Sequence, residues 1–322
     1  MFLNVARAQM AYFIPSERFS SSLISSICQD SQGSLWVATD YGLNRFDGYA
    51  FQTYLHEEND STTLQANVVV CLLCDADGRL WVGTNRGLDR YDHATESFRH
   101  YPFPDGLHPR VTSILCARDG RLLVGTAGYG AFTIDDDERV VPFSLAEGAS
   151  YFSRFFEDSR GRLWRSGFDD VITMREGDKL QNFHSQKGVP MGFVELDDCL
   201  LVACQHGLMS FSNGRMSVAN IDMSVVAGKD VNFSTVTANS DGEIYIGTRG
   251  QGLYRISSAR PRRLEQVELS AYGIDANTAK LRAAMFDGEG NLWMACESKG
   301  LLLVPQRPEQ FRSWSFEAQG IR

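Results

Sequence analysis

The sequence has no long hydrophobic run, no excess of positive charge and no residue spacing typical of a metal site. A segment that spans a bilayer needs about 18 apolar residues, and none of the apolar runs approaches that length. Lys and Arg number 31 against 40 Asp and Glu, which gives a formal net charge of -9. Nucleic-acid binding draws on clustered basic side chains, so we expect no nucleic-acid partner and no membrane-spanning segment.

The cysteines and histidines also lack the patterns of cofactor sites. The seven cysteines are Cys28, Cys71, Cys74, Cys116, Cys199, Cys204 and Cys296. Most stand in apolar segments, where a free cysteine behaves as a small hydrophobe. Cys71 and Cys74 have the C-x-x-C form, but a strand points residues three apart to opposite faces, so a shared metal or disulfide is not expected. The six histidines show no ligand spacing, and we expect neither metal nor cofactor.

One segment, clearest as Asp75-Ala76-Asp77-Gly78-Arg79-Leu80-Trp81, recurs seven times. With the turn position as reference, the copies fall at Gly33, Gly78, Gly120, Gly161, Asp198, Gly242 and Gly290. Three positions later a large apolar residue always follows, namely Trp36, Trp81, Leu123, Trp164, Leu201, Tyr245 and Trp293. A period of about 40 to 50 residues with several short strands is typical of a propeller blade, which must stack on neighbours to bury its faces. The sequence therefore predicts an all-β fold, a seven-bladed β-propeller.

Each copy divides into four short strands separated by turn residues. In the first copy the expected strands are 23–28, 35–38, 43–46 and 51–54, with a turn at 30–33. This pattern predicts four-stranded antiparallel blades, with the aromatic residue wedged between neighbouring sheets. The acidic run 135–138 lacks the alternation of a calcium loop and is expected as the tip of a hairpin between a third and a fourth strand.

The outer strand of the seventh blade has two candidates, 12–14 at the front of the chain and 311–315 at the back. We favour the front strand, because it would join the two ends of the ring and remove an exposed edge. The expected organisation is an extension or remnant of an export signal at 1–11, the propeller at 12–316, and a lead-in to a following domain at 317–322.

The pattern D-x-x-G-x-L-W-V-G-T, followed by G-L-x-R-Y-D, resembles the two-component regulator propeller repeat. Copies one and two match it nearly throughout, and copies three, six and seven match well. Copy four has Asp170-Val171 where the Gly-Leu pair is expected, and copy five keeps only part of the pattern. The resemblance covers about residues 12–316.

The resemblance implies a non-catalytic sensor module rather than an enzyme. In that family the propeller belongs to the periplasmic sensor region of an inner-membrane hybrid two-component receptor, best represented in gut Bacteroidetes. Further blades, an immunoglobulin-like module, a membrane helix and an output domain such as a histidine kinase follow it. The implied partners are an oligosaccharide or other small ligand, the following propeller and immunoglobulin-like domains, and a second copy in a homodimer.

Loops that join the second strand to the third, and the fourth strand to the next blade, should converge on one mouth of the ring. Candidate ligand-binding residues in the shorter loops are Tyr41, Arg86, Tyr129, His206, Arg249, Glu297 and Lys299. Aromatic faces stack on sugar rings and basic groups pair with carboxylates, so this mixture suits sugars or uronic acids. Two long loops, 56–67 and 222–232, are either surface or a docking surface for another domain.

Two other function classes remain open. Streptogramin-type and polysaccharide lyases also use seven-bladed rings, and their sites need a His base; here only His206 is expected in a mouth loop, without an evident set of carboxylate ligands. We therefore assign no catalytic residue. A purely structural ring, whose surface docks other domains or a second receptor chain, is the third alternative.

Overall fold

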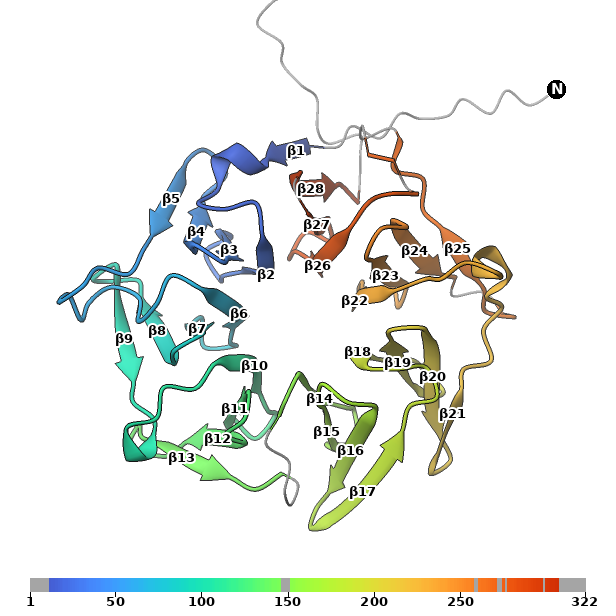
Figure 1. Ribbon diagram of the computed structural model, residues 1–322, viewed down its shortest axis with the longest axis horizontal. Helices are drawn as coiled ribbons and strands as arrows, with labels where there is room; N and C mark the ends of the chain where they lie inside the picture. Colours follow the sequence, from blue (N-terminus) through green and yellow to red (C-terminus); the bar gives the residue numbers. More distant parts are fainter. Residues whose placement is uncertain are drawn as a thin grey trace, which may run out of the picture.

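Seven four-stranded antiparallel sheets surround a common axis (Figure 1). The computed structural model describes residues 12–145, 151–257, 260–270, 274–275, 277–297 and 299–306. Blades one to six are meanders in which consecutive strands pair from the innermost strand to the outermost, and in blade seven the outermost strand comes from the front of the chain. The predicted fold class and blade number are confirmed.

The first three blades follow one another without crossovers. Blade one contains β2 (Ile24–Gln29), β3 (Leu35–Thr39), β4 (Gly42–Phe46) and β5 (Phe51–Tyr54). Blade two contains β6 (Val69–Cys74), β7 (Leu80–Thr84), β8 (Leu88–Asp92) and β9 (Ser97–Tyr101). Blade three contains β10 (Val111–Cys116), β11 (Leu122–Thr126), β12 (Ala131–Ile134) and β13 (Val140–Phe143).

The next three blades repeat this order. Blade four contains β14 (Arg154–Glu157), β15 (Leu163–Ser166), β16 (Val171–Glu176) and β17 (Lys179–His184). Blade five contains β18 (Pro190–Glu195), β19 (Leu200–Cys204), β20 (Gly207–Ser212) and β21 (Arg215–Val218). Blade six contains β22 (Phe233–Ala238), β23 (Ile244–Thr248), β24 (Leu253–Ile256) and β25 (Leu264–Gln266). Three short 3-10 helices lie in connections: η1 (Ser16–Arg18), η2 (Pro104–Gly106) and η3 (Ser224–Val226).

Blade seven joins the two ends of the described chain. It contains β26 (Leu281–Phe286), β27 (Leu292–Cys296) and β28 (Gly300–Val304), and its outer strand is β1 (Tyr12–Pro15). β1 pairs antiparallel with β28, and the amide of Ser16 then donates to the carbonyl of Lys299 at 2.9 Å. The front strand thus closes the ring, as expected. The other candidate, 311–315, and the predicted extensions 1–11 and 317–322 lie outside the described residues.

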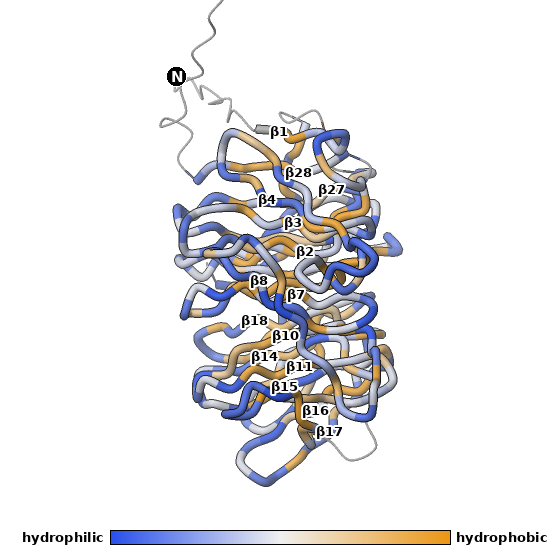
Figure 2. The backbone as a smooth tube through the Cα atoms, turned by 90° about the vertical axis from the view of Figure 1, so that its left-hand side faces the viewer, coloured by the Kyte–Doolittle hydropathy of each residue, from blue (hydrophilic) through white to orange (hydrophobic). Residues whose placement is uncertain are grey.

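The large apolar residue of each repeat packs against the next blade. Trp36 of β3 and Trp164 of β15 are fully buried, and Trp36 contacts Tyr91 of blade two with ring centroids 4.7 Å apart. Trp164 contacts Phe211 of blade five at 4.8 Å, and Trp293 packs with residues of blade one. Hydrophobic residues therefore concentrate in the strands, and hydrophilic residues in the loops (Figure 2).

In the described ranges, no helix has the length and apolar character needed to cross a membrane.

The Asp that opens each complete repeat is a structural group. In blade two, one oxygen of Asp75 accepts from the amides of Asp77 and Arg79, and the other accepts from the Trp81 indole at 2.9 Å. Burial raises the pKa of Asp75, but the hydrogen bonds from Trp81 and Arg79 outweigh it and leave the pKa below its usual value. The equivalent indole bonds recur in blades one, four and seven. The repeated motif therefore fixes a hairpin and its aromatic wedge.

Candidate functional site

The two faces of the ring differ in which turns they carry. We call the face with the first-to-second-strand turns the hairpin face, and the opposite face, with the second-to-third turns and the connections between blades, the mouth face. All seven candidate residues lie on the mouth face, in the turns after β3, β7, β11, β19, β23 and β27. These turns bond to the connections beside them; for example, the amide of Asn85 donates to Val68 and that of Arg249 to Asn232.

One mouth-face cavity of about 610 Å³ lies at blades one and two. Its lining residues are His56, Glu58, Asn59, Gln65, Arg86, His100 and His108. Arg86 is exposed, and within the described ranges its guanidinium has no hydrogen-bond or ion-pair partner. The expectation that only His206 lies in a mouth loop is wrong: His56 and His108 stand in the connections β5–β6 and β9–β10, and His100 reaches the cavity from β9.

The β5–β6 connection holds two of these histidines in fixed orientations. His56 Nδ1 lies 2.6 Å from the carbonyl of Leu64, and His100 Nε2 lies 2.7 Å from that of Thr63. A carbonyl only accepts, so both of these ring nitrogens carry a proton, and the second nitrogen of each ring is left for other partners. The amide of Phe98 donates to the carbonyl of Thr62 at 2.7 Å, which attaches the loop to β9. The long loop 56–67 is thus packed on blade two.

Asp89 of β8 lies buried beneath this loop. Gln65 donates to both of its oxygens, from the amide at 3.0 Å and from Nε2 at 2.6 Å, and His100 Nε2 is 3.9 Å away. Burial raises the pKa of Asp89 to about 6, although the hydrogen bonds from Gln65 and the charges of His100 and His56 act in the opposite direction. Asp89 therefore holds the loop from below, while the Arg86 guanidinium supplies donors to the cavity above it.

A second group on the mouth face consists of exposed aromatic rings at blades three and four. Tyr129, Tyr151 and Phe168 are each more than half exposed, and Tyr151 contacts Phe168 edge to face with centroids 6.3 Å apart. Nearby, Arg165 is 6% exposed, lies over the Phe152 ring at 5.2 Å, and has an Nε atom without a hydrogen-bond partner in the described structure. Sequence reasoning found Tyr129 but missed Tyr151 and Phe168, although the turn at Phe168 has the position of a mouth loop.

The remaining candidates lie at other blades. His206 Nδ1 is 3.9 Å from Asp230, and Glu297 pairs with Arg282 at 3.2 Å. Arg249 forms a backbone bridge with Lys280 between blades six and seven. Tyr41 is exposed at blade one, and Lys299 accepts the closing hydrogen bond from Ser16. The structure therefore places the predicted residues on one face, and Arg86 is the one of them that lines a cavity described here.

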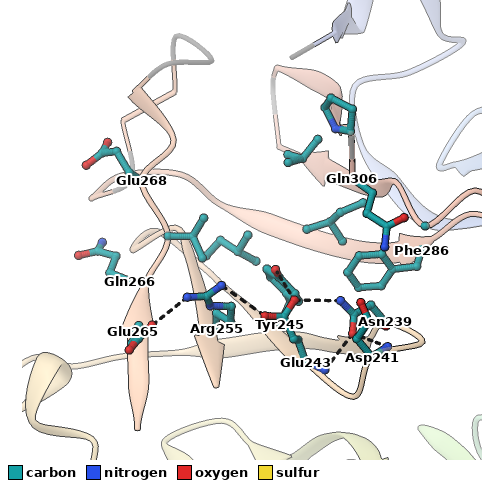
Figure 3. Close-up of a pocket in the computed structure, with 16 residues that line it drawn as sticks. Asn239, Asp241, Glu243, Tyr245, Arg255, Glu265, Gln266, Glu268, Phe286 and Gln306 are labelled. Atoms are coloured by element: carbon teal, nitrogen blue, oxygen red, sulfur yellow. Dashed lines mark hydrogen bonds and ion pairs between the residues drawn. The ribbon is translucent and has the colours of Figure 1, made fainter. Parts of the chain in front are cut away.

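A cavity of about 480 Å³ between blades six and seven has a different character (Figure 3). Its central cation, Arg255, pairs with Glu243 at 3.4 Å and Glu265 at 3.0 Å. Since these carboxylates already pair with Arg255, and Asp241 and Glu268 add further negative charge, this cavity is less suited to an anion than the Arg86 cavity. In the part of the chain that the structure describes, no group of three His, Cys, Asp or Glu side chains could hold a metal ion.

Sequence comparison identifies the repeat. The family described as "Two component regulator propeller" matches residues 18–41 and 63–86, which lie in copies one and two. Histidine kinase P4 of Formosa agariphila is 44% identical over 52 residues, 16% of this chain and 4% of that protein. The chain thus spans a small part of the curated relative it matches.

Solved structures share the fold over nearly the whole chain. The extracellular domain of the putative hybrid two component system BT3049 from B. thetaiotaomicron superposes with a TM-score of 0.79 at 21% identity, covering 95% of this chain and 43% of that one. Virginiamycin B lyase from Staphylococcus aureus superposes with a TM-score of 0.72 at 16% identity, covering 91% and 98%. At these identities the likeness shows the fold alone. The chain is thus a seven-bladed propeller whose copies one and two match the two-component regulator propeller repeat.

Proposed function

We propose that this chain is the N-terminal propeller of the periplasmic sensor region of a hybrid two-component receptor. It binds, or helps to bind, an oligosaccharide that carries a carboxylate, and passes the signal to a C-terminal output domain. The Arg86 cavity is the observation that carries this proposal. The repeat match and the likeness to extracellular domains of two-component systems support the receptor class. The following propeller and immunoglobulin-like domains, and a second receptor chain, are the proposed protein partners.

The chemistry of the cavity favours an acidic sugar over a neutral one. A guanidinium can grip a carboxylate through two parallel hydrogen bonds, and Arg86 has no partner within the described ranges. His56, His100 and His108 line the same cavity, and among its lining residues Glu58 is the one exposed carboxylate. On the same face, Tyr129, Tyr151 and Phe168 present rings on which further sugar units can stack.

Calorimetric titration with galacturonate oligosaccharides, and with neutral gluco-oligosaccharides of equal length, tests the proposal. We expect the acidic series to bind more tightly, and Arg86→Gln to weaken that binding about tenfold or more, since a charge-assisted hydrogen bond contributes roughly 1.5 to 3 kcal/mol. Arg118→Gln is the matched control, because Arg118 is an exposed arginine on the hairpin face. Equal binding by wild type and Arg86→Gln, or no binding of either series by the complete ectodomain, would contradict the proposal.

A glycan lyase is the second candidate, favoured by the His206–Asp230 pair, whose nearest atoms are 3.9 Å apart. A carboxylate near an imidazole can orient it, as a proton-abstracting base requires. Elimination from a uronate leaves an unsaturated product that absorbs in the ultraviolet. If that absorbance grows with wild-type protein and vanishes with His206→Ala, the enzyme assignment replaces the sensor assignment.

A further inference from the structure

The inner strands of blades one and two approach each other closely along their length. The hydroxyl of Ser25 in β2 donates to the carbonyl of Val69 in β6 at 2.7 Å, and the amide of Leu72 donates to the hydroxyl of Ser26 at 3.2 Å. Further along the same two strands, the sulfur atoms of Cys28 and Cys74 are 2.7 Å apart. Two side chains from different blades, 46 positions apart in sequence, therefore meet at a third point of this junction.

A contact of this length is too close for two unreacted thiols, because it lies inside the van der Waals separation of two sulfur atoms. We propose that Cys28 and Cys74 form a disulfide that links blade one to blade two. Both cysteine residues are of intermediate burial. This disulfide would join β2 to β6 and is independent of ligand binding. It rests on the extracytoplasmic location proposed above, where disulfides persist.

The reaction is a balanced two-electron oxidation. The thiols of Cys28 and Cys74 lose two protons and two electrons as the S–S bond forms, and a disulfide-bearing oxidant, either a protein or a glutathione disulfide, takes them up and becomes two thiols. Burial raises the pKa of the Cys28 thiol well above its usual value, and Cys74 and the charge of Asp30 add to the effect. Because the thiolate is the attacking species, we expect the bond to form while the blades assemble and to exchange slowly afterwards.

The repeat supplies a control at the next junction. By strand register, Leu73 of blade two occupies the position of Cys28, since each pairs with the Trp of its blade. Cys116 of blade three likewise occupies the position of Cys74, since each pairs with the Leu that opens the second strand. At the junction of blades two and three, Leu73 therefore stands where blade one has Cys28. Cys116 has no cysteine opposite it there, so we expect it to stay a thiol.

Alkylation of the denatured full chain counts the thiols. We expect five modified cysteines, rather than seven, in protein exported to a bacterial periplasm, and the same number in protein refolded with oxidised and reduced glutathione. A non-reducing tryptic digest should contain peptide 19–45 joined to peptide 46–79. Because peptide 46–79 holds both Cys71 and Cys74, the Cys71→Ser variant should keep the joined peptides and Cys74→Ser should lose them.

Thermal unfolding gives an independent readout. Closing a long loop restricts the unfolded chain, so reductant should lower the Tm of wild type by a few degrees. The Tm of Cys74→Ser should not respond to reductant, whereas that of Cys116→Ser should respond as wild type does. Seven alkylated cysteines in both preparations, or a link from Cys28 to Cys71, would overturn the proposal; neither result depends on whether the protein binds a sugar.

Discussion

The hairpin face and the mouth face of the ring use the same kinds of side chain in opposite ways. On the hairpin face, four aspartates accept hydrogen bonds from the amides and indoles of their own hairpins, namely Asp30, Asp75, Asp158 and Asp287. On the mouth face, Arg86 lines an open cavity and the rings of Tyr129, Tyr151 and Phe168 are exposed. The aspartates of the recurring motif are therefore structural, whereas Arg86 and the three exposed rings stay accessible to a ligand.

This difference also explains where the blades depart from the repeat. The position of Asn44 in blade one is Asp89 in blade two, and both are fully buried close to the mouth face. Asn44 bonds to Ser20 and Thr53, whereas Asp89 holds Gln65 of the β5–β6 loop. The residue at this buried position thus holds a mouth-face connection in both blades, at Ser20 before β2 in blade one and at Gln65 of the longer β5–β6 loop in blade two.

The largest contrast between the faces should appear on removing one aromatic ring from each. Trp164→Ala should lower the free energy of unfolding by about 4 kcal/mol, because a fully buried wedge leaves a cavity between blades four and five. Tyr129→Ala removes a ring that is 53% exposed, and should change stability by less than about 0.5 kcal/mol. Denaturant unfolding measures both; similar losses for the two variants would show that the mouth-face ring is part of the core.

A smaller contrast compares two aspartates within the hairpin face. Asp158 is buried and accepts from the Trp164 indole at 2.8 Å and from Arg162 at 2.7 Å, so Asp158→Ala should cost about 3 kcal/mol through the donors left unpaired. Asp119, in the turn of blade three, pairs with Arg121 in solvent, and Asp119→Ala should cost about 0.5 kcal/mol. If thermal and denaturant unfolding gave equal losses, the Asp–Trp hydrogen bond would not be what stabilises the hairpin.

The fold could be predicted because its determinants recur. A wedge such as Trp36 and a turn such as the one at Gly33 appear at near-equal intervals, and this repetition implies equivalent sheets around an axis. The front strand was predicted to close blade seven from the cost of an exposed edge. The hydroxyls of Thr39 and Thr84, six positions after the turn glycines, donate to the carbonyls of Gly42 and Gly87 and so fix the mouth-face turns. The sequence did not predict this role.

The candidate site was only partly predictable, because it depends on contacts between segments far apart in sequence. The turn position of Arg86 could be found from the repeat. His56 and His100 stand 44 positions apart, and only the folding of loop 56–67 over β9 brings them together. The contact of Cys28 with Cys74 was missed for the same reason: spacing along one strand says nothing about a neighbour from the next blade.

The smallest expected effect is a pH dependence of stability that has opposite signs for Asp158 on the hairpin face and Asp89 near the mouth face. The folded protein holds the pKa of Asp158 below its usual value, because the hydrogen bonds from Trp164 and Arg162 outweigh burial; the stability it contributes is therefore present above about pH 4 and lost on further acidification. For Asp89 the folded pKa of about 6 lies above the unfolded value, so its contribution is largest below about pH 4 and is lost as the pH rises to 6.

We therefore expect the free energy of unfolding of Asp89→Asn, relative to that of wild type, to rise by about 2 kcal/mol from pH 4.5 to pH 7, because the amide carries no charge to bury. Urea unfolding at the two pH values measures this difference. Asp158→Ala should stay at a constant offset from wild type between these two pH values. A constant offset for Asp89→Asn as well would mean that Asp89 is solvated like a surface carboxylate, and that the loop over it opens in solution.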